Sequence, residues 1–182
     1  ARGEFSRERA REIAAYPSVK AFEIKLSQGA KPGKGGVLPA AKVTEQIAKI
    51  RGIPVNTDSI SPNRHRDIAN ADQLLEKIAL VRDITGKPVG IKTAIGDSGW
   101  LDDLFALIVK RGVESAPDFF TIDSAEGGSG AAPMSLMGDV GLPLRECLPM
   151  IVDKLNQYGL RGRVKVCVSG KLVTPADVAW AL

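Results

Sequence analysis

The feature of this sequence that most restricts its fold is a repeated alternation between short apolar segments and longer segments of helical periodicity. We predict strands near residues 21–27, 88–93, 118–123 and 164–168, each followed by a loop and a helix. Units of this kind build parallel sheets, and nearly apolar strands predict that helices cover the sheet. The pattern therefore predicts an α/β fold, but it fits a (β/α)8 barrel and a doubly wound sheet equally well.

Apolar spacing and capping residues predict the helices. A surface helix is expected over residues 6–15, and Val43, Ile47 and Ile50 fall on one face of a second helix. Residues 52–70, rich in Pro, Asn and Asp, are expected to be irregular. The other helices are expected from Asn70 to Gly86, from Ser98 to Gly112, from Leu144 to Gly159, and from Thr174-Pro175 onward.

Composition and charge argue against several classes of protein. The chain has 182 residues, 44% of them hydrophobic and 25% charged, as in an ordinary globular domain. The net charge of +4 is spread along the chain without an aromatic-rich basic motif, so we expect no nucleic acid partner. No apolar run approaches the roughly 20 residues of a membrane helix. The chain has one histidine, and Cys147 and Cys167 have no metal-ligand spacing, so we expect no metal site. A reducing, cytoplasmic location is the default expectation for such a chain.

A loop rich in glycine and lysine, residues 25–36, follows the first predicted strand. Its glycines, at positions 29, 33, 35 and 36, allow the backbone to approach a ligand closely. Its lysines supply positive charge at the end of a strand, where α/β proteins place their sites. The loop therefore indicates a site for an anionic ligand, although a surface loop with solvated lysines remains the alternative.

Several motifs follow the order of those in one protein family. The longest is Ile24-Lys25-Leu26-Ser27-Gln28-Gly29-Ala30-Lys31-Pro32-Gly33. The shorter ones are Leu38-Pro39, Ile60-Ser61-Pro62, Gly90-Ile91-Lys92, Gly127-Gly128-Ser129-Gly130-Ala131, Gly141-Leu142-Pro143 and Ser169-Gly170-Lys171-Leu172. Together they resemble the FMN-binding barrel domain of glutamate synthase and of glutamate synthase-like flavoproteins. The resemblance extends over residues 21–182.

The resemblance implies a (β/α)8 barrel, of which this chain is too short to form the whole. A complete barrel needs about 250 residues. We therefore expect residues 1–182 to be the C-terminal part of a single FMN-binding barrel domain, roughly strands four to seven with their helices. The cysteines that ligate an iron–sulfur cluster in glutamate synthase have no counterpart in this chain. A truncated product and a separately encoded piece are both compatible with this length.

The resemblance also implies which residues bind FMN. Lys92 would face the flavin and stabilise its reduced, anionic form, whereas the alternative is a lysine that extends to solvent. Gln28 would contact the pyrimidine edge of the ring system, and the alternative is a glutamine that stabilises a turn. Backbone N–H groups of the late loops would hold the phosphate. The loop residues implied are Gly127, Gly128, Gly130, Ser169 and Gly170, for which structural turns are the alternative. Lys171 departs from the small or apolar residue usual in the family.

Substrate binding is implied for Lys31 and Arg51, which match family positions that hold the carboxylates of 2-oxoglutarate. Lys31, with Lys92, is also our candidate for a catalytic residue. However, Val37 stands where the family has a glutamine, and a valine cannot make the hydrogen bonds of that amide. This departure argues against 2-oxoglutarate while leaving the flavin reading intact. His65 matches the family pattern but is assigned no catalytic role.

The resemblance implies that the parent protein is an FMN-dependent glutamate synthase-like oxidoreductase with amino-group and 2-oxo acid chemistry. In glutamate synthase the product is glutamate, formed from 2-oxoglutarate and ammonia. Its reductant would reach the flavin through a partner subunit or a cluster. Two alternatives stay open. The chain could be an inactive half-barrel that forms a homodimer through open sheet edges, or a part of another phosphate-binding barrel. The glycine-lysine loop argues against the second alternative.

Overall fold

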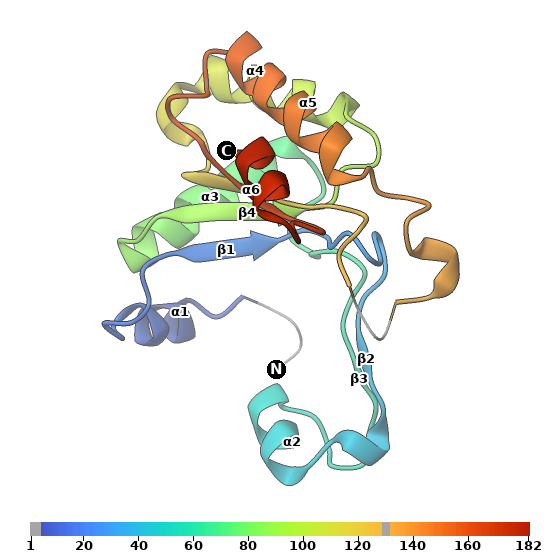
Figure 1. Cartoon of the computed structure of the whole chain (residues 1–182). Helices are drawn as coiled ribbons and strands as arrows, with labels where there is room; N and C mark the ends of the chain where they lie inside the picture. The colour runs from blue at the N-terminus through green and yellow to red at the C-terminus, as the bar shows by residue number, and fades with distance from the viewer. Residues whose placement is uncertain (1–4, 129–131) are drawn as a thin grey trace.

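The structure, a computed structural model, describes residues 5–128 and 132–182. Its centre is a sheet of parallel strands in the order β1 (Phe22–Lys25), β4 (Val89–Thr93), β5 (Phe119–Asp123) and β6 (Lys165–Ser169). Figure 1 shows this sheet together with the helices that connect its strands. The predicted strands, their parallel direction and the α/β class are thereby confirmed.

Five of the helices match the sequence prediction in position. They are α1 (Arg7–Ala14), α3 (Ala71–Thr85), α4 (Gly99–Arg111), α5 (Leu144–Gln157) and α6 (Pro175–Ala181). Asn70 caps α3 by accepting a hydrogen bond from the N–H of Gln73, and Gly86 ends this helix in the left-handed conformation. Thr174 and Asp177 form a reciprocal capping box at the start of α6.

Ser98 occupies the N-cap position of α4, as predicted, but its hydroxyl accepts no hydrogen bond from the helix. Asp97 takes this role instead, because its Oδ1 accepts a hydrogen bond from the N–H of Gly99 at 3.1 Å.

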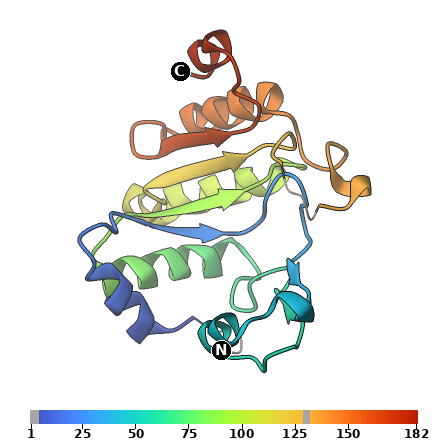
Figure 2. The same cartoon turned by 60° about the horizontal axis from the view of Figure 1, so that its bottom comes forward.

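Within the described residues, helices cover one face of the sheet, so the expectation from apolar strands was too broad. Ile24, Ile91 and Phe120 lie opposite one another in register and belong to the main core. Buried side chains of α3, α4 and α5 complete this core. In Figure 2, α4 is seen behind the strands. The residues between these positions point to the other face, which is polar and which we call the open face. Its members are Glu23, Lys25, Gly90, Lys92, Phe119, Thr121, Asp123, Lys165, Cys167 and Ser169.

The strand order separates the two α/β architectures that the sequence alone left open. In a doubly wound sheet the strand order reverses, and helices lie on both faces. Here each strand of the main sheet pairs with the next one along the chain, and the helices between them share one core on one face. This arrangement is consistent with a partial (β/α)8 barrel, in which the open face corresponds to the barrel interior.

Residues 37–60 form an arm that projects from the sheet (Figure 1). Its two strands, β2 (Val37–Leu38) and β3 (Ser59–Ile60), are antiparallel, and α2 (Glu45–Arg51) lies at its far end. The predicted apolar helix face over Val43, Ile47 and Ile50 is wrong. Val43 is buried but precedes the helix, whereas Ile50 is 72% exposed. Short 3-10 turns lie at Ala40–Lys42, Val113–Ser115 and Met134–Leu136.

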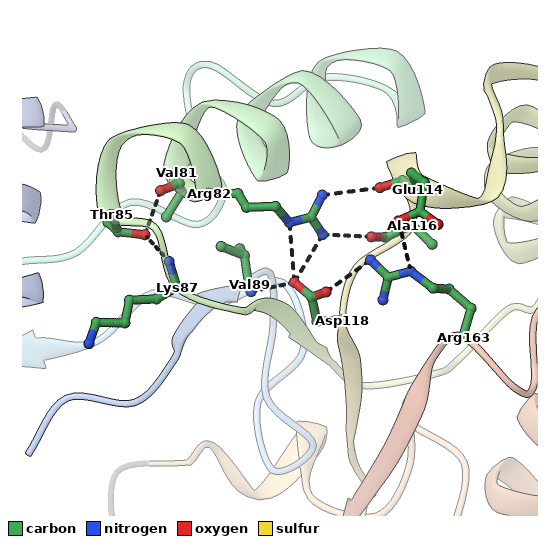
Figure 3. Close-up of polar contacts among 9 residues, drawn as sticks. All are labelled: Val81, Arg82, Thr85, Lys87, Val89, Glu114, Ala116, Asp118 and Arg163. Carbon is green, nitrogen blue, oxygen red and sulfur yellow. Dashed lines mark hydrogen bonds and ion pairs between the residues drawn. The ribbon is translucent and has the colours of Figure 1, made fainter.

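An ionic cluster around Asp118, with Arg82 and Arg163, lies at the amino ends of the strands (Figure 3). Asp118 accepts hydrogen bonds from the N–H of Val89 at 2.7 Å, from Arg82 Nη2 at 3.0 Å and from Arg163 Nη2 at 2.9 Å. Burial alone would raise the pKa of Asp118, but these donors hold it below its usual value. The cluster joins α3, β4 and the segments before β5 and β6, so it stabilises the end of the sheet opposite the candidate site.

Candidate functional site

The carboxyl ends of β1, β4, β5 and β6 surround a cavity of about 390 Å³, which we call the strand-end cavity. Parallel strands deliver their following loops to the same edge, which is why residues distant in sequence meet here. All the predicted flavin-binding residues that the structure describes line this cavity. They are Gln28, Lys92, Gly127, Gly128, Ser169 and Gly170. Gly130 lies outside the described residues.

Lys92 reaches the strand-end cavity because β-strand alternation turns it away from the core. Its neighbours Ile91 and Thr93 are buried on the helix-covered face, while the Lys92 side chain is 26% exposed on the open face. Its Nζ lies 3.6 Å from Oδ2 of Asp123. A part-buried ammonium needs an anionic partner, and the structure supplies one that sequence analysis missed.

Asp123 joins three segments of the site. Its Oδ1 accepts a hydrogen bond from the hydroxyl of Ser169 at 2.6 Å, and its Oδ2 accepts one from the N–H of Gly29 at 3.1 Å. The one signal in the sequence was an acid at the end of an apolar strand, followed by a glycine-rich loop. That signal indicates a site residue but gives no partner, because all its partners are distant in the chain.

Two glycines allow the loops after β1 and β6 to pack on the end of β5. A Cβ at Gly29 would lie 1.7 Å from the carbonyl oxygen of Ser124. A Cβ at Gly170, where φ is +143°, would lie 1.8 Å from Oγ of Ser124. Both positions therefore require glycine, because atoms of Ser124 occupy the space that a side chain would need. Lys171 follows with a positive φ of 33° and also lines the strand-end cavity.

Glu126 is a second acid in the strand-end cavity. Its Oε2 accepts a hydrogen bond from the N–H of Leu144, at the amino end of α5, at 2.9 Å. It also accepts one from the hydroxyl of Ser124 at 3.3 Å. The charged lining residues are thus Lys25, Lys92 and Lys171 against Asp123 and Glu126, which leaves a formal charge of +1 (three positive minus two negative).

A second cavity of about 350 Å³ lies between the glycine-lysine loop and the segment after β3, and we call it the cationic cavity. Lys31 lines it and is 9% exposed. Gly35 allows the two walls to touch, since a Cβ there would lie 2.0 Å from the carbonyl oxygen of Ser61. Its charged lining residues are Lys25, Lys31, Lys34 and Arg64, together with His65, and no Asp or Glu is among the described residues that line it.

His65 and Gln28 hold the loop that separates the two cavities. Nε2 of His65 lies 2.9 Å from the carbonyl oxygen of Lys25, at hydrogen-bond distance. Oε1 of Gln28 accepts a hydrogen bond from Nζ of Lys25 at 2.8 Å. Both contacts keep the end of β1 in place beside the two cavities, and they agree with a structural role for His65.

The structure does not bring Arg51 to the cavity that Lys31 lines. Arg51 ends α2 on the projecting arm, where its Nη1 donates to the hydroxyl of Ser59 at 2.9 Å. Val37 also lies on the arm, paired with Ile60 across the β2–β3 ribbon, and both side chains are exposed. The predicted substrate role of Arg51 therefore depends on contacts that this structure does not show.

Neither cysteine lines the strand-end cavity or the cationic cavity. Cys147 is buried in α5, and burial raises the pKa of its thiol to about 11. Cys167 is exposed on the open face of β6. Within residues 5–128 and 132–182, no group of three or more His, Cys, Asp or Glu side chains could hold a metal ion. In the same part of the chain, no helix has the length and apolar character needed to cross a bilayer.

Comparison with known families identifies the relationship of this chain to other proteins. A family model described as a conserved region in glutamate synthase matches residues 14–182. The chain belongs to the glutamate synthase family. The predicted resemblance is therefore confirmed. The matched residues include all the residues that line the two cavities.

Several glutamate synthase relatives align with most of the chain. The glutamate synthase large subunit-like protein YerD of Bacillus subtilis is 44% identical over 180 residues, which are 99% of this chain and 34% of YerD. The archaeal-type glutamate synthase (NADPH) of Thermotoga maritima is 38% identical over 164 residues, 89% of this chain and 31% of the relative. The archaeal glutamate synthase (NADPH) of Methanocaldococcus jannaschii is 37% identical over 164 residues, with the same shares of 89% and 31%. This chain spans about a third of the length of these relatives.

Proposed function

We propose that this chain is part of the FMN-binding (β/α)8 barrel of a glutamate synthase-like oxidoreductase. One observation carries the proposal: consecutive parallel strands bring the residues expected to bind FMN to one cavity at their carboxyl ends. Membership of the glutamate synthase family supports it independently. In this proposal residues 1–182 are a portion of one barrel domain, and β1, β4, β5 and β6 are its strands four to seven.

The chemistry of the strand-end cavity fits FMN. The phosphate would lie beside Gly128, Ser169 and Gly170, which line the cavity after the last two strands of the sheet. The N–H of Gly127 donates to the carbonyl oxygen of Ser124 at 3.1 Å, so Gly127 would give the loop its shape rather than a donor for the phosphate. Lys92 and Gln28 lie on the β1–β4 side of the same cavity, where they would hold the ring system. When bound, FMN supplies hydride transfer. The protein supplies orientation and charge, through Lys92 beside the ring.

The cationic cavity is our candidate for the 2-oxo acid. Its basic residues and the absence of acids among its described lining favour a carboxylate ligand, and Lys31 would hold that carboxylate as a point charge. Because the strand-end and cationic cavities share Lys25 and Gln28, a substrate in one would lie beside a flavin in the other. Val37 on the arm lacks the amide that the family carries, so the substrate could be a 2-oxo acid other than 2-oxoglutarate.

The test uses the natural full-length protein. FMN should be released on denaturation in a ratio close to one per chain, and the protein should form an amino acid from a 2-oxo acid, ammonia and a reductant. Several 2-oxo acids are compared, with 2-oxoglutarate among them. Lys31→Met should weaken substrate binding without loss of FMN, while Lys110→Met, in α4, serves as a control for loss of a lysine. A protein without flavin would overturn the proposal.

One observation favours a second candidate, in which the chain by itself is a half-barrel that pairs with another copy. β1 and β6 are the outer strands of the main sheet, and a largely apolar hollow of about 620 Å³ lies between α5, β6 and α6. Sheet edges and apolar hollows of this kind promote association. Sedimentation velocity of the isolated chain would show a stable dimer if this candidate is correct. Because an isolated piece of a barrel would also lack flavin, the two candidates are separated by the flavin content of the natural full-length protein, which only the first candidate predicts.

A further inference from the structure

Asp123 lies where three segments of the strand-end cavity meet. It is the last residue of β5, its side chain is 14% exposed, and it points to the open face. Its Oδ1 accepts from Ser169 at 2.6 Å, and its Oδ2 accepts from the Gly29 N–H at 3.1 Å. The same Oδ2 lies 3.6 Å from Nζ of Lys92. Its partners thus belong to the loop after β1, to β4 and to β6.

The backbone around Asp123 leaves little room for adjustment. Gly29 is packed so closely on Ser124 that a Cβ would lie 1.7 Å from its carbonyl oxygen. On the other side, the N–H of Ser124 donates to the carbonyl oxygen of Ser169 at 2.9 Å. The loops after β1 and β6 therefore both pack against residues 123–124, and loss of the Asp123 carboxylate would loosen both loops.

A carboxylate suits this position because an ionised carboxylate only accepts hydrogen bonds, and all of its neighbours here are donors. It also carries the charge that opposes Lys92. Without Asp123, the ammonium of Lys92 would face the cavity with less compensation, because Glu126 is bound to the amino end of α5 and to Ser124. Asp123 therefore affects a ligand of the cavity in two ways: it positions Gly29 and Ser169, and it offsets the charge of Lys92.

We propose that Asp123 is a positioning residue of the flavin site: its carboxylate holds Gly29, Lys92 and Ser169 in place and offsets the charge of Lys92. This inference rests on the proposed FMN function for its electrostatic part. Its geometric part concerns the protein alone. The two parts predict different measurements, and each is tested separately.

The geometric part is tested on the full-length protein after its flavin has been removed. Trypsin cleaves after Lys34, in the loop that Gly29 begins, whereas Pro32 protects the bond after Lys31. Asp123→Ala removes all the acceptors and should accelerate cleavage after Lys34 about tenfold, relative to cleavage after Lys110 in α4. Mass spectrometry of the early fragments gives both rates.

Asp118→Asn is the matched control, because Asp118 lies just before the same strand and binds arginines at its opposite end. It should raise both cleavage rates in proportion through lower global stability. An Asp123→Ala protein that shows the same proportional increase would overturn the geometric part. Asp123→Asn, which keeps one acceptor oxygen, provides a variant that folds if the alanine variant does not, and it should give a smaller selective increase.

The electrostatic part is tested by the reduction potential of bound FMN. Asp123→Asn removes a negative charge beside Lys92, so it should raise the potential, whereas Lys92→Met should lower it. The double variant should lie between the two. A merely structural role for Asp123 requires no particular sign, whereas the electrostatic role requires a rise in Asp123→Asn that Lys92→Met opposes in the double variant. Unchanged or lowered potential in Asp123→Asn would overturn this part.

The two proposals fail in distinguishable ways. If FMN binds and the potential of Asp123→Asn does not rise, the electrostatic role fails and the proposed function stands. If the unmodified protein contains no FMN, the proposed function fails with the electrostatic role, and trypsin cleavage after Lys34 still decides the geometric role.

Discussion

Lys92 lies between two buried residues of β4, but its own side chain points to the strand-end cavity. Its neighbours along β4 are in the core, so its aliphatic part is fixed while Nζ faces the strand-end cavity beside Asp123. In our proposal this ammonium lies near the flavin ring, where negative charge accumulates on reduction.

Lys92→Met keeps most of the side-chain volume and removes the charge. We expect a lower flavin reduction potential and slower flavin reduction in the full-length protein, with the fold intact. Cys167→Ser is the control, since Cys167 lies on the same open face of the sheet but does not line the strand-end cavity. Spectroelectrochemical titration measures the potentials. Equal potentials for Lys92→Met and the unmodified protein would show that the charge points away from the flavin.

At Gly29 a single added methyl group would have a large local effect. Its Cβ would lie 1.7 Å from the carbonyl oxygen of Ser124, a backbone atom that cannot rotate away. Gly29→Ala should therefore destabilise the full-length protein by about 1–3 kcal/mol, the usual range for overpacking, and weaken FMN binding. Gly162→Ala, with open space around its Cβ position, should change neither. Denaturant unfolding and flavin fluorescence titration provide the two measurements.

At the scale of secondary-structure elements, the Asp118 cluster links α3 and β4 to the segments that precede β5 and β6. Arg82 in α3 donates to Asp118 and to the carbonyl oxygen of Ala116 at 2.8 Å, while Arg163 precedes β6 (Figure 3). Asp118→Asn keeps the shape but loses the charge, so it should cost about 2 kcal/mol at pH 7.

The pH dependence of this cluster follows from the lowered pKa of Asp118. A carboxyl whose pKa is lower in the folded state contributes stability above its unfolded pKa, about 3.9, and loses it as the pH falls through the folded value. The stability difference between the unmodified protein and Asp118→Asn should therefore be constant near neutrality and shrink below about pH 4. Urea unfolding at a series of pH values measures it, and a difference that grows in acid would contradict this assignment.

At the scale of the whole molecule, the chain presents surfaces that a closed barrel would cover. The open face exposes charged side chains, β1 and β6 are the outer strands of the sheet, and the apolar hollow beside α6 is lined by Val168, Leu172 and Trp180. The arm projects away from the sheet and carries Val37 and Ile60 exposed (Figure 1).

We expect the isolated chain to bind FMN weakly or not at all and to associate with itself through the outer strands. It provides only part of the strand-end loops, so a flavin would lose contacts that other loops of a barrel supply. Equilibrium dialysis with FMN and sedimentation velocity at several concentrations check both points. Tight, stoichiometric binding of FMN to a monomer would contradict this expectation.

The sequence by itself determined the strands of the main sheet and five of the helices, because apolar spacing and caps such as Asn70, Gly86 and Thr174 act within a few residues. Its motifs also indicated Lys92, Gln28, Ser169 and the glycines that line the strand-end cavity. Only the tertiary structure decided the rest. It showed that helices cover one face of the sheet, that Asp123 joins Gly29 to Ser169, and that Arg51 lies on an arm apart from Lys31. The physical reason is that strand order, register and hydrogen bonds between distant loops depend on contacts that no local pattern of residues specifies.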